Sequence, residues 1–192
     1  MLYHGTAEEN FSSIQHHRTL FSAALLAPER RYIKRGGAEP IMFGDRVVLL
    51  RDQLALRKHQ MELEGGWSCG ALLAALNSRV FFWPGNQDGP NRYGCNFVEA
   101  YRNRGKRLLL LRVPFDDMRR ANPDATAYFC KVNSGAPRMS AGRKSGRGPG
   151  TFRIAEDWHD PPSRVAEVSF VGKIIVPEST EVWDEAAGWR SL

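Results

Sequence analysis

The sequence predicts an α+β fold in a single domain over residues 1–192, with helices concentrated in the N-terminal half. Three observations lead to this prediction. A chain of 192 residues has the usual size of one domain. A hydrophobic content of 42% is typical of a protein with a packed core. Helical patterns lie mostly in the first half of the chain, and apolar strand patterns lie mostly in the second.

The chain begins with a predicted strand followed by helical segments. The stretch "MLYHGT", residues 1–6, is typical of a short strand that ends in a turn. Thr6 and Glu9 are spaced as in a capping box, which predicts a helix over residues 7–17. A second helical piece lies within residues 18–37, where two glycines interrupt it.

The middle of the chain contains the clearest pattern. Residues 46–53 fit either a strand or the lead into a helix. The alanine- and leucine-rich residues 68–78 predict a short helix, and "RVFFW", residues 79–83, predicts a buried strand. Residues 96–105 predict a helix that ends at Gly105, where a C-cap glycine belongs.

The second half is dominated by predicted strands. A short helix of one or two turns is expected over residues 115–123. Apolar and β-branched runs predict strands on both sides of it, at residues 106–114 and 126–132, and order resumes at 151–158. Residues 163–177 predict two further strands hinged near Gly172.

Residues 133–150 have the least regular composition in the chain. They contain four basic residues, no acids, five glycines and two prolines, which predicts a long irregular loop. One interpretation is a solvated insertion. The other is phosphate contact through Arg138, Arg143, Lys144 and Arg147. The net charge of +6 also favours an anionic partner.

The composition indicates a cytoplasmic protein without a membrane partner. No apolar run approaches the ~20 residues of a membrane-spanning helix. The first residues lack the basic and apolar regions of a signal peptide. Cys69, Cys95 and Cys130 are too widely spaced to suggest a zinc site or a disulfide frame, so we expect no metal.

Several common catalytic motifs are missing, and the candidate residues are scattered. The sequence contains no GxxxxGK[ST] phosphate loop, no GxGxxG between a strand and a helix, and no HExxH. His4 and Gly5 are either surface residues of a strand end or ligand contacts, because an imidazole can donate to hydroxyls and glycine permits close approach. Arg51 either forms an ion pair with an acid such as Asp52 or binds a pyrophosphate bidentately.

Two further candidates lie within predicted strands. Glu167 shares one strand face with Val165 and Ser169. It is either an edge or solvated charge, or a positioned carboxylate that stabilises a cation or activates a hydroxyl. Phe81 and Phe82 are either core residues or a stacking surface for a planar ring.

The order of these pieces resembles the ADP-ribosyltransferase superfamily over about residues 2–176. The opening "LYHGT" with "ENFSSIQHHRTLFSA" is similar to the start of poly(ADP-ribose) polymerase-like catalytic domains, which carry His-Gly followed by Ser or Thr. "RVFFW" resembles the family's second motif, with phenylalanine replacing the usual tyrosine, and "VAEVSF" resembles the third motif with its strand glutamate. The basic loop stands where the family keeps its substrate loop. Small bacterial members, including DarT-type DNA ADP-ribosyltransferases, look most similar.

The resemblance implies a split β-sheet core and NAD as a substrate, without a metal. His4 is expected to donate to the adenosine ribose, and the Gly5 backbone to bond the nicotinamide amide, with Thr6 beside them in the NAD site. Glu167 is expected to hold the ribose 2′-hydroxyl, stabilise the oxocarbenium-like transition state and help to deprotonate the acceptor. His4 and Glu167 are therefore the expected catalytic residues.

The remaining contacts and the acceptor follow from the same resemblance. Phe81 or Phe82 is expected to stack on the nicotinamide, and Arg51 to bind the pyrophosphate. The basic loop favours a nucleic acid, DNA or RNA, as the acceptor. Because Val165 stands where arginine-directed members carry a glutamate or glutamine, an arginine target is not expected.

Several alternatives stay open at this point. In one alternative the acceptor is a protein. In another the acceptor is water, and the chain is then an NAD glycohydrolase. An alternative of another class is a nucleic-acid-binding domain without catalysis, in which the basic charge is the whole function. The resemblance also implies a toxin or phage-defence role, with a neutralising partner protein.

Overall fold

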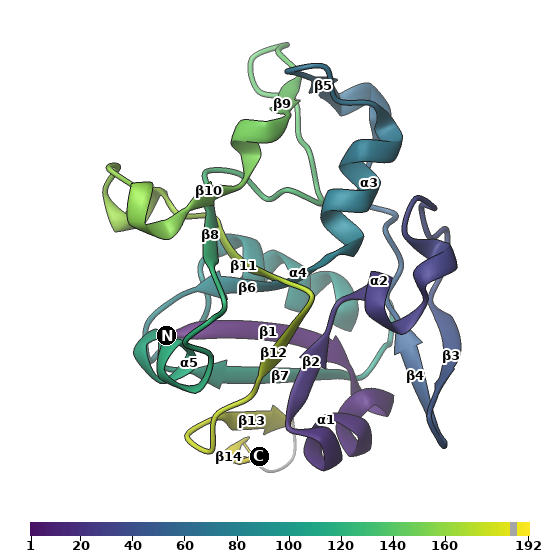
Figure 1. Ribbon diagram of the computed structural model, residues 1–192, viewed down its shortest axis with the longest axis vertical. Helices are drawn as coiled ribbons and strands as arrows, with labels where there is room; N and C mark the ends of the chain where they lie inside the picture. Colours follow the sequence, from purple (N-terminus) through teal and green to yellow (C-terminus); the bar gives the residue numbers. More distant parts are fainter. Residues whose placement is uncertain (185–187) are drawn as a thin grey trace.

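An eight-stranded sheet forms the centre of the computed structural model, which describes residues 1–184 and 188–192 (Figure 1). Its strands follow the order β10-β8-β11-β6-β1-β7-β13-β14, and each neighbouring pair is antiparallel. The strands are β1 (Leu2–Ala7), β6 (Arg79–Pro84), β7 (Leu108–Val113), β8 (Ala127–Cys130), β10 (Arg153–Ile154), β11 (Glu167–Val171), β13 (Glu181–Asp184) and β14 (Gly188–Ser191).

The sheet separates into two four-stranded halves between β1 and β6. These two strands share only the pairs Leu2–Pro84 and Tyr3–Trp83. Beyond these pairs, β1 stays paired with β7 and β6 stays paired with β11. The remaining parts of β1 and β6 therefore diverge, and Figure 1 shows β1 and β7 in one half and β6, β8 and β11 in the other.

Three two-stranded sheets surround the main one. Strand β2 (Thr19–Phe21) pairs with β12 (Lys173–Ile175), and β3 (Glu39–Phe43) forms a hairpin with β4 (Arg46–Leu50). Strand β5 (Met61–Leu63) pairs in parallel with β9 (Ser145–Arg147). Short 3-10 helices cover Glu8–Asn10, Pro28–Arg30, Lys58–Gln60, Pro149–Thr151, Ala155–Asp157 and Pro162–Arg164.

Five α-helices complete the described chain, and four of them begin in its first half. They are α1 (Phe11–His17), α2 (Ala23–Leu26), α3 (Cys69–Asn77), α4 (Arg92–Arg102) and α5 (Phe115–Ala121). Ser68 caps α3 by accepting a hydrogen bond from the Ala71 amide at 3.1 Å. Asn91 caps α4 in the same way. The α+β class and the N-terminal concentration of helices are confirmed.

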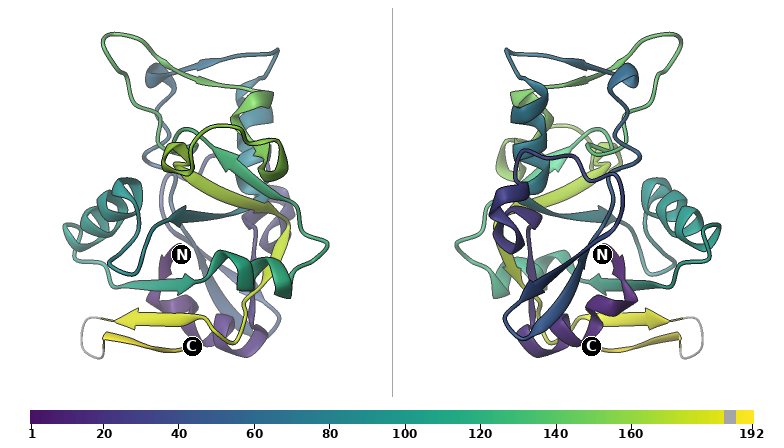
Figure 2. Two further views of the ribbon diagram at one scale, coloured as in Figure 1. Left: turned by 90° about the vertical axis from the view of Figure 1, so that its left-hand side faces the viewer. Right: turned by 90° about the vertical axis from the view of Figure 1, so that its right-hand side faces the viewer.

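The two faces of the main sheet are covered by different helices. Side chains alternate along β7, so Leu109 and Leu111 face the large core that includes Met118 of α5. Leu110 faces the other way, toward Tyr3 and Phe97 of α4. Figure 2 shows α4 and α5 on opposite sides of the strands. No helix in the described part of the chain has the length and apolar character that crossing a bilayer requires.

Two predictions about local structure are wrong, and a third holds only narrowly. Among the described residues, the second half contains eight of the fourteen strands, β7–β14, while β1–β6 lie within the first 84 residues. Thr6 belongs to β1 and caps no helix; its Oγ1 accepts a hydrogen bond from Asn10 instead. Residues 133–150 are not wholly irregular, because β9 lies within them. A strand of three residues depends on its tertiary partner, so it has too little periodicity to detect.

Candidate functional site

A cavity of about 350 Å³ lies where β1 and β6 separate. Its volume falls within the range of roughly 300–1,000 Å³ that is usual for small-molecule sites. Most of the site residues expected from the sequence line it, although they lie far apart along the chain. These are His4, Gly5, Thr6, Arg51, Phe81, Arg138 and Glu167.

Glu167 begins β11, between β8 and β6, and the residue is 5% exposed. Its Oε2 accepts hydrogen bonds from the Ser134 amide at 2.8 Å and from the Ser134 hydroxyl at 2.6 Å. No donor in the described chain bonds its Oε1. The interpretation of Glu167 as an edge or solvated charge is therefore wrong, because it is a buried carboxylate with one oxygen committed to Ser134.

Burial and local charges act on the Glu167 carboxyl in opposite directions. Burial raises its pKa above the ordinary value, while the two hydrogen bonds from Ser134 and the charges of Arg51 and Arg147 lower it. Burial is the largest effect, so the pKa stays raised. Such a carboxyl is able to exchange a proton nearer to neutral pH than an exposed glutamate.

Arg147 does not belong to the exposed part of the basic loop. It is 1% exposed and donates to the carbonyls of Asn133 at 2.7 Å and Ser134 at 3.0 Å. It also bonds the Ser145 hydroxyl and the Gly146 carbonyl. Its predicted contact with an acceptor phosphate is wrong, because β9 returns the chain to the protein interior.

His4 bridges the gap between the diverging strands. Its Nδ1 lies 2.8 Å from the carbonyl oxygen of Phe81, and a carbonyl only accepts, so Nδ1 carries the proton. Burial and the charge of Arg51 lower the His4 pKa to about 4, against that hydrogen bond. The ring is therefore neutral at pH 7, and its Nε2 is an acceptor. The prediction that His4 donates to a ligand hydroxyl is reversed, since this nitrogen accepts.

Gly5 is required by packing around α4. A Cβ at this position would lie 2.6 Å from Cε1 of Phe97 and 3.2 Å from Trp83. The space above Gly5 is thus filled by an aromatic ring of this chain, and any ligand contact of Gly5 involves its backbone. Thr6 lines the same cavity, with Oγ1 held by Asn10.

The aromatic strand β6 presents its side chains to two different sides. Phe82 is 1% exposed and packs edge-on against Phe170 in the main core. Its predicted stacking on a ligand is wrong, because alternation places it on the core side. Phe81 and Trp83 line the cavity, so Phe81 retains the predicted position.

Two arginines line the cavity near the hairpin of β3 and β4: Arg51 directly follows β4, and Arg35 precedes β3. Arg51 is exposed, and its guanidinium carbon lies 4.5 Å from the centre of the Phe97 ring. Arg35, which the sequence analysis missed, is 7% exposed and donates to the Arg51 carbonyl at 2.7 Å. It also donates to Asn77, at the end of α3. No pattern in the sequence connects positions 35, 51 and 77, which meet only through these bonds.

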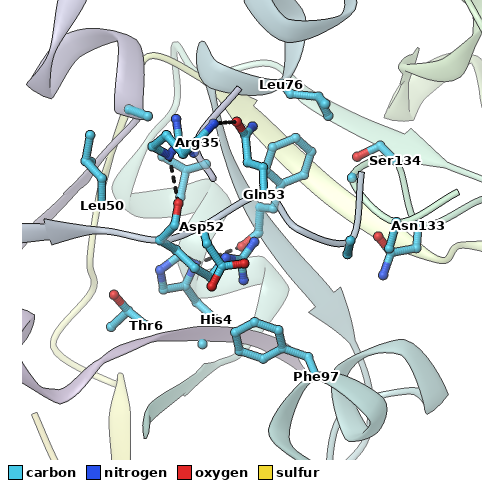
Figure 3. A pocket seen from close by; sticks show the side chains of 18 of the residues that line it. His4, Thr6, Arg35, Leu50, Asp52, Gln53, Leu76, Phe97, Asn133 and Ser134 are labelled. Atoms are coloured by element: carbon cyan, nitrogen blue, oxygen red, sulfur yellow. Dashed lines mark hydrogen bonds between the residues drawn. The ribbon is translucent and has the colours of Figure 1, made fainter. Parts of the chain in front are cut away.

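One face of α4 was also missed, although its spacing is regular. The residues of this face that line the cavity are Tyr93, Asn96, Phe97, Ala100 and Tyr101. A spacing of three and four residues is the signal of one helix face. Figure 3 shows Phe97 beside the cavity, with Asn133 and Ser134 on one side of the view and Thr6 and Leu50 on the other.

The cavity carries more positive than negative charge. Five arginines and two carboxylates line it: Arg35, Arg51, Arg79, Arg104, Arg138, Asp52 and Glu167. Asp52 is 3.4 Å from Arg104, so one carboxylate has a cationic partner. No group of three or more metal-ligating side chains was found among the described residues. The charge balance favours an anionic ligand.

The tip of the basic loop lies outside the cavity. Arg138, Arg143 and Lys144 are exposed, and only Arg138 also lines the cavity. The chain reverses at Ala141 and Gly142, which both have positive φ angles, and Ser140 and Arg143 bond each other across the turn. The tip is therefore a basic hairpin, and Arg138 connects it to the lining of the cavity.

The chain belongs to DUF7002, a family of unknown function, whose sequence profile matches residues 1–180. No curated protein and no solved structure matches the chain.

Proposed function

We propose that this protein is an NAD-dependent mono-ADP-ribosyltransferase with a nucleic acid, DNA or RNA, as its acceptor. The observation that carries the proposal is the position of Glu167. A buried carboxylate stands on a central strand with one oxygen held by Ser134, and it shares a cavity with a neutral histidine and with arginines that include Arg51, which has no ion pair among the described residues. The order of "LYHGT", "RVFFW" and "VAEVSF", which resembles the ADP-ribosyltransferase superfamily, supports the same function.

The proposed reaction breaks one bond and forms another at the ribose carbon C1′ of NAD. The bond from C1′ to the nicotinamide nitrogen breaks, and nicotinamide leaves as a neutral molecule with the bonding electrons. A nucleophile of the acceptor forms the new bond to C1′ and loses a proton. Positive charge develops on the ribose ring in the transition state, as in glycoside hydrolysis.

Glu167 fits this reaction because an ionised carboxylate stabilises developing positive charge most effectively in a water-poor site. Its Oε1 is the oxygen available for the ribose 2′-hydroxyl, since Oε2 is committed to Ser134. Its raised pKa also suits the removal of the acceptor proton.

Other residues that line the cavity fit the rest of the dinucleotide. His4 offers an acceptor nitrogen, which suits a hydroxyl of the adenosine ribose. Arg35 and Arg51 provide positive charge for the pyrophosphate, and no carboxylate of the described chain forms an ion pair with Arg51. Phe81 and Trp83 provide apolar surface for the nicotinamide ring.

The basic tip supports a nucleic acid as the acceptor. Arg138, Arg143 and Lys144 are exposed, and Arg138 also lines the cavity, so these side chains are able to contact phosphates of an acceptor whose base enters the site. A bacterial toxin or phage-defence role, in the cytoplasm and with a neutralising partner, is part of the proposal and rests on the resemblance alone.

The test is incubation of the purified protein with NAD labelled in its adenosine half, together with separate pools of DNA, RNA and protein. Mass spectrometry then follows free nicotinamide and ADP-ribose attached to each pool. We expect nicotinamide release and labelled nucleic acid with the natural protein, and neither with Glu167→Gln, which keeps the size of the side chain but not its charge.

Other outcomes identify a different function. Labelled protein identifies a protein-directed transferase, and free ADP-ribose alone identifies an NAD glycohydrolase. Intact NAD in every pool, combined with tight binding of nucleic acid, contradicts the enzyme and leaves a nucleic-acid-binding domain.

A further inference from the structure

Arg147 is a buried cation without a buried anion bonded to it. Its guanidinium donates to the carbonyl oxygens of Asn133, Ser134 and Gly146 and to the Ser145 hydroxyl, at distances between 2.6 and 3.0 Å. It forms no ion pair with a carboxylate of the described chain. Burying an arginine is costly unless its donors are satisfied, and an apolar side chain fills such a space at less cost. The arginine therefore needs a reason beyond packing.

The carbonyls that Arg147 binds belong to the same peptide segment that binds Glu167. The Ser134 carbonyl accepts from Nε of Arg147, while the Ser134 amide and hydroxyl donate to Oε2 of Glu167. Arg147 thus fixes the peptide segment that holds the carboxylate, and neutral acceptors at Asn133 and Ser134 leave its positive charge uncancelled.

Arg147 and Glu167 are connected by the loop as well as by these bonds. The loop that carries the exposed tip begins after Ser134 and ends at β9. There, Arg147 donates hydrogen bonds to the carbonyls of Asn133 and Ser134. Strand β5 holds β9 through the pair Leu63–Arg147. Both ends of the tip are therefore anchored around the carboxylate.

We propose that Arg147 is a positioning residue that holds the Glu167 carboxylate in a single orientation through the backbone of Asn133 and Ser134. Arg147 touches no substrate in this arrangement. It keeps Oε2 of Glu167 engaged by Ser134 and leaves Oε1 facing the ribose. The role of Oε1 in this inference rests on the proposed function, whereas the link from Arg147 to Glu167 does not.

The test combines kinetics with a direct measurement on the Glu167 carboxyl. The variants are Arg147→Met, Arg147→Lys and Ser134→Ala, with Arg57→Met as the control because Arg57 is exposed and outside the cavity. Carbon-13 NMR of glutamate-labelled protein follows the titration of Glu167, whose signal is assigned by its loss in Glu167→Gln. Thermal unfolding shows whether each variant is folded.

We expect Arg147→Met to lower kcat by about 100-fold with little change in KM, because a small displacement of a reacting group has an effect of this size. The pKa of Glu167 should rise, since the variant removes a positive charge and loosens two hydrogen bonds that lower it. The charged or titratable groups acting on this carboxyl are Arg51, Arg147 and Cys130, and the first two lower its pKa. Arg147→Lys should fall between Met and the natural protein, because one ammonium cannot reach four acceptors.

The proposal is overturned if folded Arg147→Met keeps the kcat and the Glu167 titration of the natural protein. If that variant does not fold, an unchanged titration in both Arg147→Lys and Ser134→Ala overturns it. A shifted titration in a protein that never consumes NAD supports the positioning role and contradicts the proposed function. The two failures are thus distinguishable.

Discussion

The two walls of the cavity differ in charge and in how that charge is held. One wall contains Glu167 and the segment at Ser134, where a buried anion is bonded by neutral donors. The other wall contains His4, Arg35 and Arg51, where the charge of Arg51 acts on an uncharged imidazole. Each wall thus leaves its charge available to a ligand.

This difference in charge favours one orientation of a bound ligand. The cavity favours a ligand that has a cationic or electron-poor end and an anionic middle. The electron-poor end is stabilised beside Glu167, and the anionic middle is stabilised beside the arginines. NAD has this distribution, with its nicotinamide end and its pyrophosphate. We therefore expect substitution of Glu167 to lower kcat, and substitution of Arg51 to weaken the binding of NAD.

The largest expected effect is the loss of turnover in Glu167→Gln. The amide cannot stabilise positive charge on the ribose, so kcat should fall by about 1,000-fold, the upper range for one electrostatic group. Affinity for NAD, measured by calorimetry, should stay within a few-fold, because the bonds from Ser134 are retained. A parallel loss of affinity contradicts the division of roles between the walls.

The second expected effect is on stability as a function of pH. The folded protein resists protonation of His4 down to about pH 4, whereas the unfolded chain takes up the proton below about pH 6.5. The stabilising contribution is thus complete above pH 6.5 and is lost as the pH falls toward 4. At about 1.4 kcal/mol per pH unit, the loss reaches about 3 kcal/mol.

The variant His4→Asn isolates this contribution, because its amide is able to donate to the Phe81 carbonyl in place of Nδ1. Urea unfolding across this pH range should show a shallower decline for the variant than for the natural protein. Identical pH profiles would mean that His4 is solvated and that its pKa is not lowered by burial and by Arg51.

A third prediction concerns Arg51 and mirrors the one for Glu167. Replacing Arg51 with methionine removes charge-assisted hydrogen bonds worth about 1.5–3 kcal/mol, so affinity for NAD should fall by about 10- to 100-fold. At a pH high enough to keep Glu167 ionised in both proteins, the kcat at saturating NAD should change little, although the loss of the Arg51 charge raises the pKa of Glu167. Calorimetry of Arg51→Met in a Glu167→Gln background measures binding without turnover, and an unchanged Kd there contradicts the pyrophosphate assignment.

The smallest expected effect is that of the exposed tip. The double variant Arg143→Gln, Lys144→Gln removes two charges outside the cavity and should reduce the salt slope of nucleic-acid binding by about 1 to 2. Binding of NAD should be unaffected. The control is Arg57→Gln, which removes one exposed charge, and an equal reduction per removed charge shows that general surface charge, rather than the tip, attracts the acceptor.

The sequence predicts a substantial part of this site. The order of "LYHGT", "RVFFW" and "VAEVSF" identifies His4, Phe81 and Glu167, and the structure brings all three to one cavity. Their strands are long enough to show alternation or a β-branched and aromatic run, so they are detectable before any tertiary contact is known.

The misassigned residues have a common cause. Arg147 and Arg143 are four positions apart in the same glycine-rich loop, yet one is buried and the other exposed. Phe81 and Phe82 are neighbours in one strand but face opposite sides. Composition does not distinguish the members of either pair, since burial depends on what packs against each side chain.

Composition and local periodicity by themselves determined the α+β class, most of the long strands and helices, and a basic loop before a strand glutamate. Tertiary structure alone decided that the sheet separates between β1 and β6, that Arg35 joins Arg51, and that Arg147 holds Ser134 against Glu167. The physical reason is the range of the forces involved. Periodicity arises between near neighbours, whereas these hydrogen bonds join residues 13 to 33 positions apart, and the chain reveals them only when folded.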